Sequence, residues 1–222
     1  WETVAPYAAR NFAHLFVVSS RQHMRMWLRC RVKTQIDEAS IMEYETLINL
    51  FDYALRMLYE KDYDLFITKA PERTFEGRLA IYLQKAYDSE FQKDFRIDIE
   101  YNREGRDVKR RHPGEERGWT EPDIILHRRN SPENFFCCEL KLDENEFNND
   151  SARMKDAVRE RYYQFGVNLY SIRPWGTELS VFMRADDYVR EEKYQFSLYN
   201  RKLIYRNQQR VWHYKDGEWH YI

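Results

Sequence analysis

Two strand-like runs lie close together in this chain: EPDIILH at residues 121–127 and FFCCELKL at residues 135–142. They place Asp123, Glu139 and Lys141 inside otherwise apolar sequence, and burying a charge without a partner is costly. The short segment between the runs is rich in turn-forming residues. The two runs are therefore expected to fold as an antiparallel β-hairpin whose charged residues need partners.

The hairpin predicts where these charges gather. A symmetric register pairs residue 124 with 138 and 126 with 136, so Asp123 faces Glu139 across the ladder, where two carboxylates ~5 Å apart repel. Because side chains alternate between faces, Glu139 and Lys141 emerge together. The opposite face carries an apolar row: Phe136, Cys138, Leu140 and Leu142. Two acids and a lysine at one point suit a hard divalent cation such as Mg²⁺.

Composition narrows the class of protein. At 222 residues the chain is long enough for one substantial core, and we expect a single domain over residues 1–222. The 36 Lys and Arg residues nearly balance the 37 Asp and Glu residues, so any affinity for nucleic acid must come from a local patch. The three cysteines, of which Cys137 and Cys138 are adjacent, cannot form an even disulfide framework and show no zinc-site spacing, which favours a reducing compartment. No run approaches the ~20 apolar residues of a membrane span, so we expect a cytoplasmic protein without a membrane partner.

Apolar residues at helical spacing predict three helices. The first begins at Ser40, with Glu43 completing a capping box, and continues to about residue 58. The second covers residues 71–90, and the third covers residues 151–165. The second helix buries Phe75, Leu79, Tyr82, Leu83 and Ala86. The third turns Met154, Val158, Tyr162 and Phe165 inward, with Arg153, Lys155, Arg159 and Arg161 around it. Residues 1–35 are expected to be mainly helical.

The remaining segments favour strands. Residues 95–101 alternate apolar and polar side chains, residues 102–118 form a charged loop, and one or two strands lie between residues 167 and 183. Residues 194–222 alternate in the same way and contain the turn signal Asp216-Gly217, typical of an antiparallel meander. The fold class is therefore α/β, with a mixed sheet flanked by helices.

The ordered motifs resemble the PD-(D/E)xK nuclease superfamily, whose fold is restriction-endonuclease-like. The resemblance runs from about Glu72 to Phe182, through a helix with an acid, a strand, a Pro-Asp strand, a Glu-x-Lys strand and a helix. Bacterial members, many uncharacterised, share local sequence: Glu72-Arg73, Leu79-Ala80-x-Tyr82-Leu83, Glu100-Tyr101-Asn102-Arg103-x-Gly105, Pro122-Asp123-Ile124-Ile125-Leu126-His127-x-Arg129, Glu139-Leu140-Lys141 and Tyr163-Gln164-x-Gly166. The nuclease-like core then spans 66–185, between a helical extension at 1–65 and a β-rich extension at 186–222.

This resemblance implies metal-dependent hydrolysis of nucleic acid, DNA in preference to RNA. Asp123, Glu139, the backbone carbonyl of Leu140 and Glu72 would hold one or two Mg²⁺ ions, for which Mn²⁺ can substitute. Lys141 would orient the attacking water or help to deprotonate it. Homodimers are common in the fold. The alternative is a non-catalytic domain that keeps the same fold to bind nucleic acid or protein.

Several assignments stay open in the sequence alone. At ~100° per residue, Glu72 lies ~36° and Glu76 ~76° from the centre of the predicted apolar stripe, so Glu72 is preferred and Glu76 is the substitute. Asp123 and Glu139 could instead form a structural pair with Lys141. Other positions have two interpretations. Glu100 could lie beside the site or face solvent, and Tyr163 and Gln164 could position phosphate or water or could cap and pack the third helix. Lys109–His112 could contact phosphates or be a solvated run, and the tail aromatics could stack on bases or pack a small sheet. A second triplet, Glu191-Glu192-Lys193, is expected to lack a buried strand.

Overall fold

The computed structural model describes residues 42–91, 95–101, 103–104, 107–108, 121–142, 147–160 and 162–222. The helix expected within residues 1–35, the cap expected at Ser40 and the basic run Lys109–His112 lie outside these residues. The described residues all belong to one unit, and so do the elements below.

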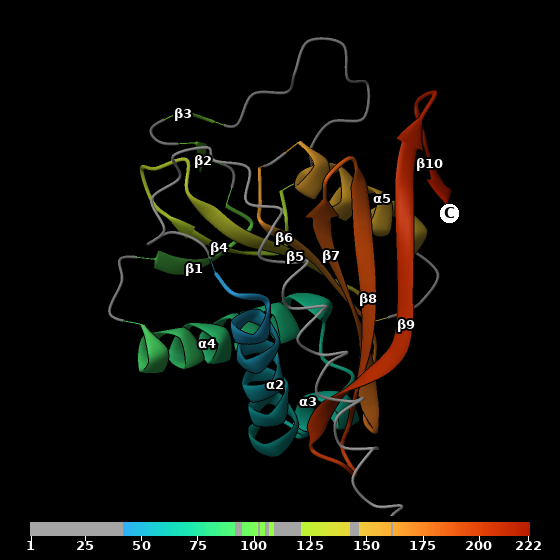
Figure 1. Cartoon of the computed structure of the whole chain (residues 1–222). Helices are drawn as coiled ribbons and strands as arrows, with labels where there is room; N and C mark the ends of the chain where they lie inside the picture. The colour runs from blue at the N-terminus through green and yellow to red at the C-terminus, as the bar shows by residue number, and fades with distance from the viewer. Residues whose placement is uncertain are drawn as a thin grey trace, which may run out of the picture. The chain divides into compact units, whose positions relative to one another are not determined.

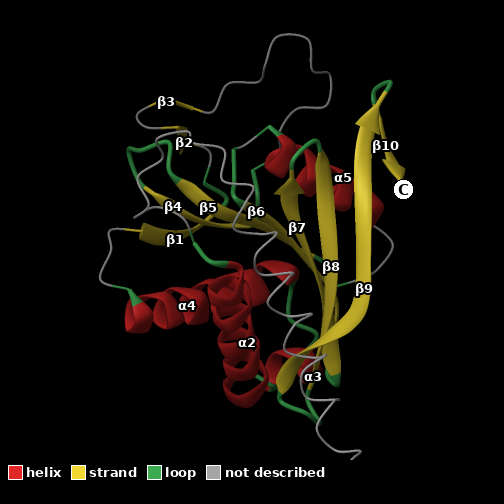
Figure 2. Ribbon diagram, in the orientation of Figure 1, coloured by secondary structure: helices red, strands yellow, loops and turns green. Residues whose placement is uncertain are grey.

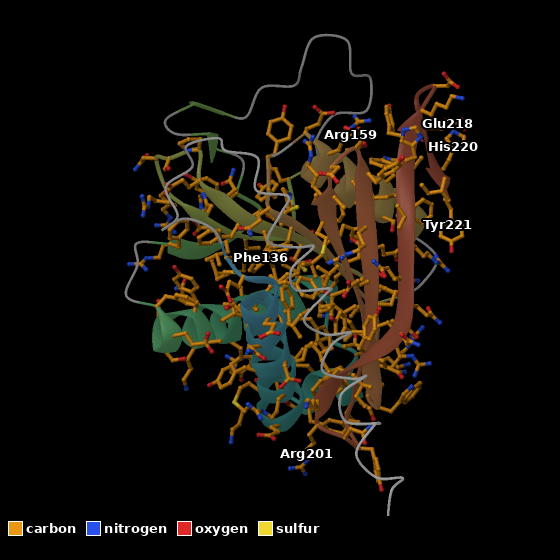
Figure 3. The ribbon with its side chains drawn as sticks, in the orientation of Figure 1. Phe136, Arg159, Arg201, Glu218, His220 and Tyr221 are labelled. Carbon is orange, nitrogen blue, oxygen red and sulfur yellow. The ribbon has the colours of Figure 1, made fainter. Side chains whose placement is uncertain are left out.

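The predicted hairpin is confirmed. Strands β4 (Ile124–Arg128) and β5 (Asn134–Leu140) pair antiparallel, with Ile124 opposite Cys138 and Leu126 opposite Phe136. The alternation is also confirmed: Phe136, Cys138 and Leu140 enter the larger core, whereas Cys137 enters a second core on the other face. Phe136, labelled in Figure 3, packs its ring 5.3 Å from that of Phe51. Local alternation and the short turn therefore suffice to fix the register.

Eight strands form one sheet in the order β1-β4-β5-β6-β7-β8-β9-β10 (Figure 1). The added strands are β1 (Phe95–Ile99), β6 (Phe165–Arg173), β7 (Gly176–Ala185), β8 (Tyr188–Ser197), β9 (Lys202–Lys215) and β10 (Glu218–Tyr221). Strands β5 and β6 are parallel, and every other neighbouring pair is antiparallel. The sheet is thus mixed, as expected, and the expected C-terminal meander continues it.

Helices pack on both faces of the sheet (Figure 2). One core joins it to α2 (Tyr44–Lys61), α3 (Asp64–Thr68) and α4 (Glu72–Glu90). The smaller core joins the other face to α5 (Phe147–Arg159), which connects the parallel strands β5 and β6. The extent predicted for α4 and its five buried side chains are confirmed.

The predicted boundaries of two helices are wrong. Helix α2 begins at Tyr44, and Glu43, expected three residues inside the helix, is its N-cap residue. Helix α5 begins before residue 151 and ends at Arg159, because Phe165 belongs to β6 and pairs with Phe136 and Met183. Backbone pairing with two neighbouring strands satisfies the N–H and C=O groups that a longer helix would have bonded internally.

Strand positions also differ in detail. Strand β1 ends at Ile99, two residues early, and the segment expected to be a loop contains a small ladder of β2 (Arg103–Glu104) and β3 (Asp107–Val108). The triplet 191–193 lies within β8, where Glu191 is buried, so the expectation of no supporting strand is wrong. The polar sequence showed no sign of a buried strand. Glu191 can be buried there because Ser180 and Trp212 donate hydrogen bonds to its carboxyl group.

None of the helices in the described segments combines the length and the apolar character that crossing a membrane requires.

Candidate functional site

The hairpin and the first turn of α4 bring the predicted site residues together. Asp123 directly precedes β4, and its Oδ2 atom accepts a hydrogen bond from the N–H of Leu140 at 2.7 Å. Its carboxyl group also shares a hydrogen bond with Glu139, the residue that the register predicted opposite it. The backbone of β5 therefore fixes the orientation of Asp123. Ligation of a metal by the Leu140 carbonyl stays a prediction.

Glu72 joins α4 to the end of β5. Its Oε1 atom lies 2.8 Å from Nζ of Lys141, and its Oε2 atom accepts the N–H of Leu142 at 3.1 Å. The lysine of the Glu-x-Lys motif is therefore held by an acid 69 residues earlier in the chain. Glu72 and Lys141 are both partly exposed, so the ion pair lies at a surface that solvent reaches.

Glu76 also reaches the site. Carboxylate oxygens of Glu72, Glu76 and Asp123 all lie within 4.8 Å of one another. Glu76 is only 5% exposed, so the ranking that placed Glu72 nearer the core is wrong with respect to burial. The predicted stripe was incomplete: Ala80 and Tyr87 are also buried, and both lie on the same helical face as Glu76.

Burial and mutual repulsion raise the pKa values of the carboxyl groups. Desolvation, followed by the charges of Asp123 and Glu72, raises the pKa of Glu76 to about 7. Desolvation also raises the pKa of Asp123, against the hydrogen bond from Leu140. Burial, followed by the charge of Asp123, raises the pKa of Glu139. A bound cation would favour the ionised form of each group, because opposite charge lowers a carboxyl pKa.

Lys141 lies beside these acids, with its Nζ atom 2.8 Å from Oε1 of Glu72. Its burial acts to lower its pKa, but the hydrogen bond to Glu72 and the charge of Asp123 outweigh that effect and raise it. The ammonium group is therefore protonated at neutral pH. This state suits holding an anion or orienting water better than accepting a proton.

Three further residues, missed by sequence reasoning, surround Glu139. Arg153 of α5 lies 3.6 Å from Oε1 of Glu139 and also pairs with Asp150. Asn168 of β6 is the neighbour of Glu139 in the parallel register. Of these three residues, only Asn168 could have been noticed in the sequence, because it is a polar residue within the otherwise apolar start of β6. The contacts of Asp150 and Arg153 depend on how α5 packs.

The remaining open positions divide between the site and the scaffold. Glu100 lies close enough for its charge to raise the pKa of Glu76, and it pairs with Arg73 at 2.7 Å. Gln164 instead bonds both backbone groups of Met42, which is a structural role. In the tail, Trp212 and Trp219 pack over Lys155, whereas Tyr205, Tyr214 and Tyr221 are exposed. Lys155 was expected around the outside of α5, but it is buried.

Comparison with family models, with curated proteins and with solved structures found no match to this chain.

Proposed function

We propose that this chain is a Mg²⁺-dependent nuclease of the restriction-endonuclease-like type that hydrolyses phosphodiester bonds in nucleic acid, DNA in preference to RNA. The observation that carries the proposal is the cluster of Glu72, Glu76 and Asp123 beside Lys141. Carboxylate oxygens are the ligands that Mg²⁺ and Mn²⁺ prefer. Here three carboxylates meet, and the ammonium group of Lys141 pairs with that of Glu72.

The order of elements supports the same proposal. An acid-bearing helix (α4) precedes an antiparallel meander (β1, β4 and β5), and α5 then leads to the parallel strand β6. This is the order that the resemblance implies. The Pro-Asp and Glu-x-Lys motifs lie on neighbouring strands of that meander, where the two acids meet.

The donor set fits a divalent cation. Glu72, Glu76 and Asp123 would hold it, with Glu139 alongside, and when bound it would neutralise the charge that develops on the scissile phosphate and lower the pKa of water. The chain itself fixes Asp123 through the Leu140 N–H and keeps Lys141 protonated next to the acids. Lys141 would then orient the water or the phosphate by donating a hydrogen bond.

A polyanionic substrate has a matching surface on β9. From Lys193 to Lys215 the chain carries six Lys and Arg residues and no Asp or Glu, although its overall charge is −1. Lys202 and Arg206 are exposed, and Tyr205 is 42% exposed beside them. Cations and tyrosines on one strand suit contacts with phosphates and with unpaired bases.

The test of activity compares the two Glu-x-Lys triplets of the chain. Purified wild type should cleave plasmid or single-stranded DNA with Mg²⁺ or Mn²⁺, and Asp123→Asn or Lys141→Met should reduce the rate at least ~100-fold. Lys193→Met is the matched control, because it removes the lysine of the triplet on β8 and should retain cleavage. Equal loss in both lysine variants, or no cleavage of double-stranded DNA, single-stranded DNA or RNA, would overturn the proposal.

A second candidate is a non-catalytic domain that binds nucleic acid or protein. One observation favours it: Glu72 and Lys141 already neutralise each other at 2.8 Å, as a purely structural pair would. Binding of Mn²⁺ that disappears in Asp123→Asn, with no cleavage of any nucleic acid, would favour this candidate. The expected homodimer and cytoplasmic location stay predictions.

A further inference from the structure

Asn168 is a buried polar residue whose side chain has no hydrogen-bond partner in the described part of the chain. It is 2% exposed, and neither Nδ2 nor Oδ1 is bonded. It lies on β6, flanked by the buried apolar residues Val167 and Leu169. An amide buried in this way costs ~1–3 kcal/mol of folding free energy for each unsatisfied group. A leucine, which has the same branching and the same number of heavy atoms, would avoid that cost, so the amide calls for an explanation.

The side chain of Asn168 lines a small gap behind the predicted site. The other lining residues include Glu139, Lys141 and Asp150, and Glu139 is the direct neighbour of Asn168 across the β5–β6 ladder. The gap leaves no room for a free water molecule. A bulk water therefore does not satisfy the amide in this arrangement. Mg²⁺ and Mn²⁺ draw oxygen ligands to within ~2.1 Å and keep some of their own water, so an ion could enter only when the Arg153 side chain, which now contacts both lining acids, moves away.

Two buried acids face the same gap, with Lys141 also in its lining and Arg153 in contact with both carboxyl groups. Glu139 is 3% exposed and Asp150 is 2% exposed, and Arg153 contacts both carboxyl groups. The Arg153 side chain is 37% exposed and long, so it can swing out into solvent. In the absence of a metal ion it serves as their counter-ion.

We infer that Glu139, Asp150 and Asn168 form a second divalent-cation subsite on the α5 side of the sheet, separate from the cluster of Glu72, Glu76 and Asp123. Asn168 supplies its amide oxygen, the two acids supply charge, and Arg153 leaves when the ion binds. The ligand class is a hard cation, Mg²⁺ or Mn²⁺, because all three donors are oxygens. The inference depends on the proposed function only through Glu139, which borders both sites.

The test measures Mn²⁺ binding to the full chain by calorimetry and by the shift in melting temperature. Asn168→Leu should weaken binding at the subsite at least ~10-fold, and it should raise the melting temperature without metal because it removes the unsatisfied amide. Arg153→Met should do the reverse: the melting temperature without metal falls, and Mn²⁺ binds several-fold more tightly because its competitor is gone.

Ser180→Ala is the matched control. Ser180 pairs with Asn168 across the β6–β7 ladder, but its hydroxyl donates to Glu191 at 3.0 Å. The variant should lower the melting temperature and leave Mn²⁺ binding unchanged. Because the Arg153 and Asn168 variants shift affinity in opposite directions, general loss of structure cannot imitate the pair of results.

The outcomes separate this inference from the proposed function. The subsite is overturned if Asn168→Leu binds Mn²⁺ as the wild type does and Arg153→Met shows no gain in affinity. That result would stand even if Glu76→Gln abolished Mn²⁺ binding and so supported the cluster of Glu72, Glu76 and Asp123. If Glu76→Gln binds normally and Asn168→Leu does not, the subsite stands and the cluster fails. Loss of stability without metal in both Asn168→Leu and the smaller Asn168→Ala would show that the amide has a structural partner, and it too would overturn the inference.

Discussion

The Nζ atom of Lys141 lies 2.8 Å from Oε1 of Glu72, so an ion pair fastens the end of β5 to the first turn of α4. The other oxygen of the same carboxyl group, Oε2, accepts a hydrogen bond from the N–H of Leu142. Both oxygens of Glu72 are therefore hydrogen-bonded. A cation that binds Glu72 must compete with Lys141 for this carboxylate.

The first prediction concerns that competition. In a double-mutant cycle of Glu72→Gln and Lys141→Met, the two residues should couple by ~1 kcal/mol in unfolding free energy without metal, since the pair is partly exposed. Saturating Mn²⁺ should reduce the coupling, because the ion takes over the carboxylate. Chemical denaturation of the four proteins gives both values. A coupling that is unchanged by Mn²⁺ would show that Glu72 does not bind the metal.

The second prediction concerns pH and Lys155. Burial under Trp212 and Trp219 lowers the pKa of Lys155 to about 8, against the charge of Glu191. The unfolded chain, with the ordinary value of 10.5, holds more protons at this lysine between pH 8 and 10.5. Stability due to Lys155 should therefore rise with pH across that window, by ~1–2 kcal/mol.

Lys155→Met measures this contribution, because it removes the titrating group and keeps the length of the side chain. The difference in unfolding free energy between wild type and variant should shift in favour of wild type as the pH rises from 8 to 10. Lys85→Met, at an exposed position of α4, is the matched control for loss of a lysine. A flat difference for Lys155→Met would contradict the prediction.

The third prediction concerns acid pH and Asp98. The hydrogen bond from Arg129, helped by His127, lowers the pKa of Asp98 below its ordinary value of 3.8, against desolvation. This contribution to stability is complete above pH 3.8 and disappears as the pH falls through the lowered value. Asp98→Asn should cost ~1–2 kcal/mol at pH 7 and progressively less below pH 3.8. Urea titrations at each pH measure it, with the exposed Asp187→Asn as control.

The fourth prediction concerns two glycines with opposite surroundings. A Cβ at Gly166 would lie 2.9 Å from the carbonyl oxygen of Met154, so α5 approaches β6 only because this residue is glycine. Gly166→Ala should cost ~1–3 kcal/mol and displace Arg153 from Glu139. A Cβ at Gly77, within α4, meets nothing within 4 Å, so Gly77→Ala should stabilise by ~0.5–1 kcal/mol. Thermal melts of the pair test both signs, and equal effects would refute the packing argument.

The fifth prediction concerns the basic surface of β9. Lys202→Gln combined with Arg206→Gln should weaken nucleic-acid binding and reduce the slope of log affinity against log salt by ~1.5. Metal binding should not change. The control pair is Lys61→Gln with Lys85→Gln, on exposed positions of α2 and α4. Fluorescence anisotropy over a salt series measures the slopes, and equal slopes in both pairs would exclude β9 as the binding surface.

Features that depend on residues close together in the chain could be predicted from the sequence. The β4–β5 register, the pairing of Asp123 with Glu139 and the extent of α4 follow from local alternation, turn residues and helical spacing, because each is fixed within about twenty residues of chain. The same reasoning failed at the end of α5, where pairing of Phe165 with two strands outweighs helical spacing.

The further groups that lie beside the acids depend on long-range packing and could not be predicted in this way. Glu76 is buried because α4 packs on the sheet through Ala80 and Tyr87, and Asn168 lies beside Glu139 because α5 brings β6 back parallel to β5. These neighbours are brought together by packing of an entire helix against a sheet. The free energy of that packing is summed over many distant contacts, so no short stretch of sequence carries a signal for it.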